Sequence, residues 1–161
     1  MKHIKLIYLI ILLGLFTQKP SFSQNNEIQW ISFEQLEDSL NIKPKKVFIS
    51  FYADWCSYCK KMDKVAFTDK RVISSLNKDY YAIKMDSESR DTIVFEGKKF
   101  YNEQVGKYRN PIHQIPLMLA SRKGYPFSLP STLILDKQFR VKKRYFEYLS
   151  KKKLAKILKN N

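Results

Sequence analysis

The fold follows from the stretch Val47–Lys60, which reads VFISFYADWCSYCK. Its apolar, β-branched beginning predicts a buried strand, and a helical pattern follows from Lys60 onward. The two cysteines of the chain, Cys56 and Cys59, therefore lie where a strand ends and a helix begins. The unpaired N–H groups of a first helical turn stabilise a thiolate, so we expect a lowered pKa for Cys56. Cys59, three residues on, is within reach of Cys56 and can resolve a mixed disulfide.

This stretch resembles the active site of the thioredoxin superfamily, in which Trp-Cys-x-x-Cys-Lys follows a strand. The longer pattern Phe51–Lys60 is similar to the thioredoxin-like domain that ends the membrane thiol transporter DsbD, and to small secreted thioredoxin-like proteins. The resemblance implies an α/β thioredoxin-like fold with a central mixed sheet flanked by helices. It also implies a thiol–disulfide oxidoreductase whose catalytic residues are Cys56 and Cys59. Their redox-active disulfide is then the only redox group, with no separate cofactor.

Two other uses of the cysteine pair have to be weighed. A zinc site usually has four ligands, and the further imidazole candidates are only His3 and His113. A purely structural disulfide would close a very short loop, and the stabilisation by a disulfide grows with loop length. The sequence therefore favours a redox role over both, with no metal bound.

The beginning of the chain has the layout of a secretory signal peptide. Lys2 and Lys5 precede an apolar run over residues 6–16, which is too short to cross a bilayer comfortably, and small residues follow up to Ser23. We expect residues 1–23 to be a signal peptide, with an uncleaved anchor as the alternative, and 24–161 to form one thioredoxin-like domain. Either reading places the domain outside the cytosol, in the periplasm of a Gram-negative bacterium or secreted.

The chain is strongly basic, with a net charge of +15 that becomes +12 without residues 1–23. The lysines are mostly scattered singly, and export argues against DNA or RNA, so we expect no nucleic-acid partner. A solvated basic surface is the simplest interpretation, and attraction to anionic lipids or acidic proteins is the alternative.

The order of predicted elements suits the same fold. Helices are expected at 33–41, 57–67, 69–77 with Thr68 as N-cap, and 151–159 with Ser150 as N-cap. Strands are expected at 45–53, 80–86 and 141–148, and after Pro130. The first strands and helices alternate, which predicts parallel pairing of 45–53 with 80–86.

Residues 87–124 exceed a minimal thioredoxin domain, and we interpret them as an insertion. They predict a hairpin with Gly97 in its turn, a helical segment at 101–109 and a helix around 114–120, with His113 in a structural role. Covering a sheet edge is favoured over shaping the substrate groove.

The resemblance extends to the segment before the last core strand. There Pro130 matches the cis-proline of the superfamily, and Leu129 is the residue that offers its backbone to a substrate peptide. Pro126 is the competing assignment, but no apolar strand follows it directly. With Trp55, these residues are the expected substrate-binding surface.

The resolving cysteine needs a proton acceptor. The buried Asp of thioredoxins is replaced here by Ser50, and the position of its partner Lys is occupied by Ala82. Asp63, one helical turn after Cys59, matches an acidic position of the DsbD-type domain. It is therefore the candidate proton relay, with a plain solvent-exposed acid as the alternative.

Together these features predict an exported oxidoreductase that reduces protein disulfides. No flavin or nicotinamide fingerprint is present, so electrons would come from a membrane donor of DsbD type. We expect a monomer whose partners are protein thiols and disulfides. The alternatives are a disulfide oxidase or isomerase, or a binding module such as a copper chaperone that uses the two cysteines with His113.

Overall fold

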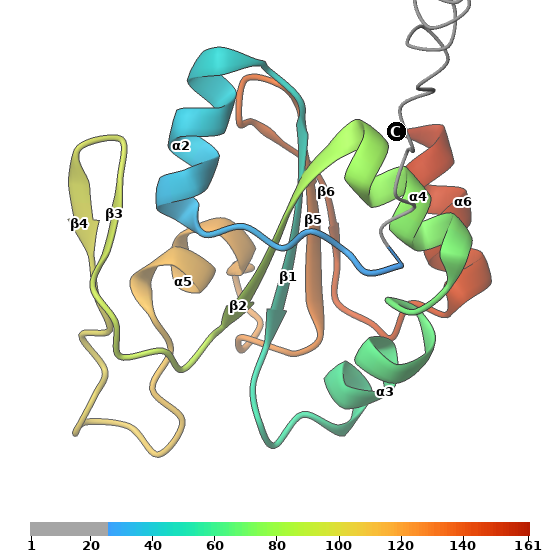
Figure 1. Cartoon of the computed structure of the whole chain (residues 1–161). Helices are drawn as coiled ribbons and strands as arrows, with labels where there is room; N and C mark the ends of the chain where they lie inside the picture. The colour runs from blue at the N-terminus through green and yellow to red at the C-terminus, as the bar shows by residue number, and fades with distance from the viewer. Residues whose placement is uncertain (1–25) are drawn as a thin grey trace, which may run out of the picture.

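The computed structural model describes residues 26–161, so the expected signal peptide at 1–23 lies outside the described residues. Figure 1 shows a central sheet with helices on both faces, which confirms the predicted α/β class with a mixed sheet. The helices are α2 (Phe33–Ile42), α3 (Ser57–Val65), α4 (Lys70–Asp79), α5 (Gln114–Ala120) and α6 (Lys151–Asn160). The strands are β1 (Lys46–Tyr52), β2 (Tyr80–Asp86), β3 (Ile93–Phe95), β4 (Lys98–Phe100), β5 (Ser131–Leu135) and β6 (Val141–Tyr145).

The main sheet has the strand order β2-β1-β5-β6. β1 pairs parallel with β2, as predicted, and antiparallel with β5, which in turn pairs antiparallel with β6. β1 is buried from Val47 to Phe51 because it lies inside the sheet and both of its faces are covered. The connection to the cysteine helix therefore leaves from an inner strand of the sheet.

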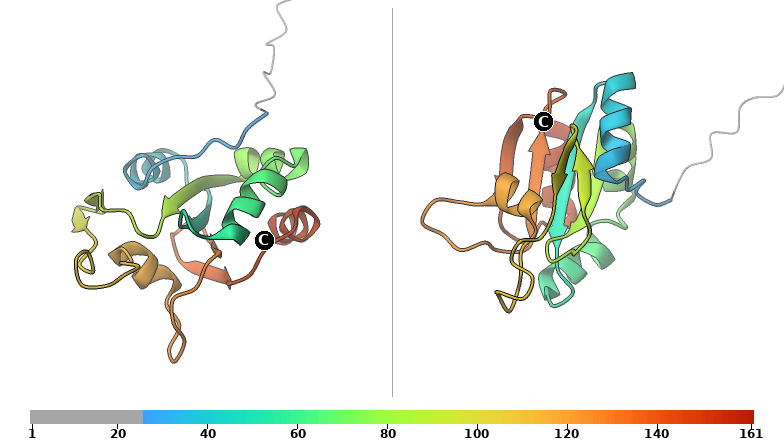
Figure 2. Two further views of the ribbon diagram at one scale, coloured as in Figure 1. Left: turned by 90° about the horizontal axis from the view of Figure 1, so that it is seen from below. Right: turned by 90° about the vertical axis from the view of Figure 1, so that its left-hand side faces the viewer.

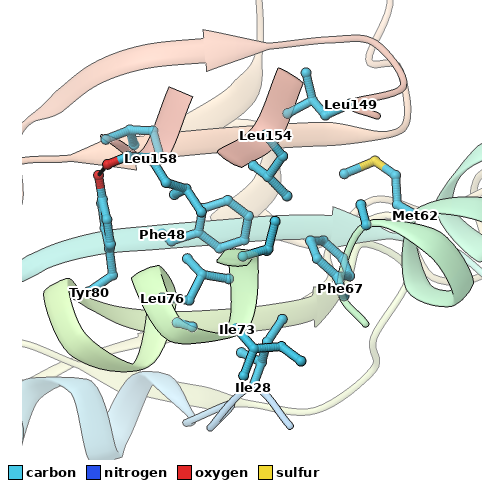
Figure 3. Close-up of a cluster of buried hydrophobic side chains, with 14 residues drawn as sticks. Ile28, Phe48, Met62, Phe67, Ile73, Leu76, Tyr80, Leu149, Leu154 and Leu158 are labelled. Carbon is cyan, nitrogen blue, oxygen red and sulfur yellow. Dashed lines mark hydrogen bonds between the residues drawn. The ribbon is translucent and has the colours of Figure 1, made fainter. Parts of the chain in front are cut away.

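One core cluster fills the space between the sheet and helices α3, α4 and α6. In Figure 3, Phe48 of β1 lies between Leu76 of α4 and Leu154 of α6, and all three are completely buried. The hydroxyl of Tyr80 donates to the carbonyl of Leu158 at 3.0 Å, which ties α6 to β2. Met62 of α3 packs into the same cluster and so anchors the cysteine helix to the core.

A second cluster covers the opposite face of the sheet, beneath α2 and α5. It contains Phe33, Ile49, Ile83 and Ile115. Helix α2 begins with the predicted capping box, since the Ser32 hydroxyl accepts from the Gln35 N–H and the Gln35 side chain accepts from the Ser32 N–H. The Phe95 ring of β3 packs against Phe33 of α2, so the β3–β4 hairpin covers the α2 end of this cluster.

Four local expectations need correction. The N-cap of α4 is Asp69 rather than Thr68, because its carboxylate accepts from the Arg71 N–H. Residues 101–109 form turns and not a helix. α3 ends at Val65 rather than at residue 67, and β6 ends at Tyr145 rather than at residue 148.

The two outer strands of the main sheet, β2 and β6, differ in what lies along their free edges. Beside β2 the chain around Trp30 forms a bridge with Ala82, and the Ile31 N–H donates to the Ala82 carbonyl at 2.9 Å. β6 carries exposed basic side chains at 142–144, and its pairing with β5 is interrupted by an irregularity. Figure 2 shows these outer strands at the two ends of the twisted sheet.

Candidate active site

Cys56 and Cys59 form a disulfide at the start of α3, with 5.3 Å between their Cα atoms. Cys56 is the N-cap residue of this helix, and its Sγ accepts from the Cys59 N–H at 3.1 Å. The Cys56 N–H in turn donates to the carbonyl of Ala53, just beyond β1. The first cysteine sulfur therefore occupies the place where a helix N-terminus stabilises negative charge.

The two cysteines hardly differ in exposure, although the hypothesis that Cys56 attacks and Cys59 resolves would have Cys56 the more exposed. Cys56 is 4% exposed and Cys59 is 5% exposed, so both are buried in the disulfide state. The neighbouring aromatic residues Trp55 and Tyr58 are both more than half exposed. An incoming group therefore meets aromatic surface before it meets sulfur.

The segment before β5 has the predicted geometry. The Leu129–Pro130 peptide bond is cis, which confirms Pro130 over Pro126 as the cis-proline. Pro130 is buried, and Leu129 is half-buried against the cluster beneath α5. The segment enters β5, which is hydrogen-bonded to β1 and pairs Ser131 with Phe51. This pairing places the cis-proline segment beside the end of β1 that leads to Cys56.

A family model described as a thioredoxin-like domain matches residues 33–161. The chain belongs to this family. DsbD of Campylobacter jejuni (strain RM1221) is 34% identical over 70 residues, which cover 43% of this chain and 12% of that protein. The match thus spans only about an eighth of the length of this curated relative.

Two solved structures illustrate the shared thioredoxin-like fold. One is described as the DsbH oxidoreductase, with a TM-score of 0.59, 15% identity and coverage of 89% of this chain and 90% of that one. The other is the reduced C-terminal domain of Neisseria meningitidis DsbD, with a TM-score of 0.51, 15% identity and coverage of 80% and 91%. The family, the Cys56–Cys59 disulfide and the DsbD relatives support thiol–disulfide oxidoreductase activity.

Within this thioredoxin-like site, Asp63 has a partner that the sequence analysis missed. The Lys84 Nζ lies 2.7 Å from the Asp63 Oδ1, and both side chains are partly exposed. Lys84 is directly opposite Ser50 in the β1–β2 register, and Ala82 packs in the core. The position expected for a lysine is therefore apolar, but a lysine two residues further along the strand lies on the same face of the sheet.

The ring of Tyr52, at the end of β1, contacts the same lysine. The Lys84 Nζ lies 4.7 Å from the centre of this ring. Burial, followed by the charges of Asp86, Asp54 and Asp63, raises the pKa of the Tyr52 hydroxyl. Tyr52 therefore stays a neutral phenol at neutral pH and supplies a ring face for the ammonium group.

Glu88, just after β2, is a second residue without a sequence signal. Its Oε1 accepts from the indole Nε1–H of Trp55 at 2.8 Å and from the Nδ2–H of Asn110, also at 2.8 Å. The contact depends on where β2 ends relative to β1, which only the folded register defines.

His113 is completely buried, in agreement with a structural role. Its Nδ1 accepts from the Ile115 N–H at the start of α5, and its Nε2 lies 3.2 Å from the carbonyl of Asp91. Both ring nitrogens are thus engaged by the backbone, which disfavours His113 as a ligand in a copper site with the cysteines. Within residues 26–161, no three His, Cys, Asp or Glu side chains gather in a way that would hold a metal ion. No helix in the same residues is long and apolar enough to span a membrane.

Proposed function

We propose that this chain is an exported thiol–disulfide oxidoreductase that reduces protein disulfides, with Cys56 as nucleophile and Cys59 as resolving thiol. The observation that carries the proposal is the Cys56 Sγ at the N-cap of α3, bonded to Cys59 and beside the cis-proline segment. The Cys56 sulfur accepts a hydrogen bond from the Cys59 N–H, and the same bond would stabilise a thiolate at Cys56 in the reduced protein. The cis-proline segment enters β5 beside the end of β1 that leads to Cys56, which supports the proposal that a substrate peptide lies there.

The reaction takes two exchanges. The Cys56 thiolate attacks one sulfur of the substrate disulfide, forms a mixed disulfide and releases the other sulfur as a thiolate. Cys59 then loses its proton and attacks the Cys56 sulfur, which releases the second substrate thiolate and forms the Cys56–Cys59 disulfide. The substrate gains two electrons and, after protonation, two protons. A membrane dithiol donor of DsbD type would reduce the Cys56–Cys59 disulfide again.

Three residues complete the proposed substrate site. The Leu129 backbone, held by the Pro130 turn, would pair with the substrate peptide, and the exposed face of Trp55 would contact its side chains. The polypeptide disulfide would thus be oriented before attack, which leaves specificity to the residues around the cysteines.

Asp63 is the proposed proton relay for Cys59. It lies one turn further along α3, on the same side of the helix. The ion pair with Lys84 holds its carboxylate at that position. Lys84 is then a positioning residue and not an acid–base group.

Export of the domain rests on the amino-terminal pattern of residues 1–23 and on the DsbD relatives. We propose a periplasmic or secreted location in a Gram-negative bacterium, where disulfides form and persist. A monomeric protein that meets protein thiols and disulfides one at a time fits this role.

The decisive experiment is the reduction potential of the Cys56–Cys59 couple in the 24–161 protein, equilibrated against dithiothreitol buffers. A reduction potential of about −270 mV would support a reductase, and one of about −120 mV would instead mean a disulfide oxidase. Cys56→Ser should abolish turnover, and Cys59→Ser should trap a mixed disulfide with substrate. Normal turnover by Cys59→Ser would overturn the assignment of the two cysteines.

A further inference from the structure

Two hydrogen bonds converge on one oxygen of Glu88, and they come from different parts of the chain. One donor is the indole of Trp55, which directly precedes the nucleophile, and the other is Asn110, which lies between β4 and α5. A single carboxylate oxygen accepts both hydrogen bonds, each at 2.8 Å. Glu88 therefore links the active-site tryptophan to the segment between β4 and α5.

The position of Glu88 is fixed by the ends of the two central strands. The Ser87 N–H and hydroxyl both donate to the Tyr52 carbonyl at the end of β1, at 2.7 and 2.8 Å. The Glu88 N–H donates to the carboxylate of Asp86, the last residue of β2. Glu88 thus projects from the rigid carboxyl end of the sheet, where β1 also turns toward Cys56.

Residues 101–112, which we call the β4–α5 segment, are anchored to the same region. The buried Asn102 side chain donates to the carbonyls of Ser89 and Pro111, and the His113 N–H donates to the Ser87 carbonyl at 2.8 Å. Figure 1 shows this segment reaching the same end of the molecule as the β1–α3 connection. Two residues before Asn110, Tyr108 is 64% exposed.

We propose that Glu88 is a positioning residue that fixes the Trp55 indole against the β4–α5 segment, so that this segment forms one wall of the surface that receives polypeptide disulfides. The inference rests on the proposed function and names its substrate class as disulfides flanked by extended polypeptide. The β3–β4 hairpin packs on α2 through Phe95, away from the cysteine pair. The β4–α5 segment is instead linked through Glu88 to the tryptophan that precedes Cys56.

The test compares a polypeptide disulfide with a small one. The rate constants at which the reduced protein reduces insulin and hydroxyethyl disulfide are measured, and their ratio reports the use of polypeptide flanks. Glu88→Ala should lower this ratio by about five- to ten-fold, since it removes both hydrogen bonds. Glu88→Gln should restore it to within about two-fold, because an amide oxygen also accepts both donors.

Two further variants separate the parts of the link. Asn110→Ala removes only the bond to the β4–α5 segment and should lower the ratio by about three-fold. Glu147→Ala is the matched control, a carboxylate that pairs with Lys153 beside α6, and it should leave the ratio as it is. Hydrogen exchange in residues 101–112 should rise in Glu88→Ala while that of β3 and β4 does not.

The outcomes are distinguishable. An equal loss with both disulfides in Glu88→Ala, or a Glu88→Gln protein as poor as Glu88→Ala, would overturn the inference and leave the proposed function intact. Reduction of neither disulfide by the wild-type protein would overturn the proposed function, and the inference with it.

Discussion

The carboxylate of Asp63 on α3 and the ammonium group of Lys84 on β2 form an ion pair, with 2.7 Å between Oδ1 and Nζ. The pair joins the helix that carries both cysteines to a strand beneath it, on the face of the sheet that this helix covers. Asp63 lies one helical turn beyond Cys59, and this spacing is the basis for the proposal that it accepts the Cys59 proton. Lys84 shares the face of Ser50, where the buried acid of thioredoxins would be expected.

If Asp63 accepts the Cys59 proton, then Asp63→Asn should slow the resolution of the mixed disulfide by about ten-fold or more, because general-base assistance is lost. Formation of the mixed disulfide by Cys56 should change little. Acid quenching during a single turnover, followed by gel separation of the mixed disulfide, measures both steps.

The matched control for this variant is Asp38→Asn, which neutralises an exposed acid on α2. Lys84→Met should slow the same step as Asp63→Asn, but less, because it leaves the carboxylate in place without its partner. A normal lifetime of the mixed disulfide in Asp63→Asn would contradict the proton-relay role and leave Asp63 only its ion pair with Lys84.

The N-cap of α4 gives a stability prediction. Asp69→Ala should lower the free energy of unfolding by about 1 kcal/mol, since it removes the acceptor of the Arg71 N–H, whereas Asp69→Ser should recover most of the loss. Urea denaturation measures the difference. Thr68→Ala is the comparison, and a larger loss there than in Asp69→Ala would restore Thr68 as the cap.

His113 gives a prediction about pH. Burial, the largest cause, lowers the pKa of its imidazole below the ordinary 6.5, although the backbone near Asp91 opposes this shift. The unfolded chain then binds more protons than the folded one below pH 6.5, so stability falls as the pH drops below that value and levels off under the folded pKa. Urea denaturation between about pH 7.5 and about pH 5.5 should show this loss.

The control for this pH effect is His113→Asn, because an Asn side chain can also accept the Ile115 N–H at the start of α5. It keeps the cap and removes the titration, so its stability should depend less on pH over the same range. Identical pH dependence in both proteins would show that other groups cause it.

Sequence patterns predicted the structure correctly where it depends on residues that are close together in the chain. β1 is an apolar run, and the capping box of α2 lies within a few residues of Ser32, so both were predicted correctly. Residues 101–109 were predicted to be helical and are not. There the Asn102 side chain accepts from the Gln104 N–H, and the Gln104 side chain accepts from the Ile112 N–H. Such side-chain bonds compete with helix formation, and a periodic pattern does not reveal them.

The contacts of the candidate site depend on pairing between distant strands. The cysteines follow from a motif, but the Lys84 partner of Asp63 requires the β1–β2 register, and the Glu88 partner of Trp55 requires the positions where those strands end. The near-equal burial of Cys56 and Cys59 likewise reflects the closed disulfide and the packing around it. None of these relationships produces a periodic pattern of residues from which it could be predicted.

The contrast between the two sheet borders bears on how the protein behaves at high concentration. A foreign strand that approached β2 would meet the Trp30 segment already bonded to Ala82, and one that approached β6 would meet the row Lys142, Lys143 and Arg144. Two copies placed β6 to β6 would bring these like charges together. The irregular pairing of β6 with β5 also makes this edge a poorer surface for another strand to pair with. The scaffold thereby resists fibril-like stacking of its own copies.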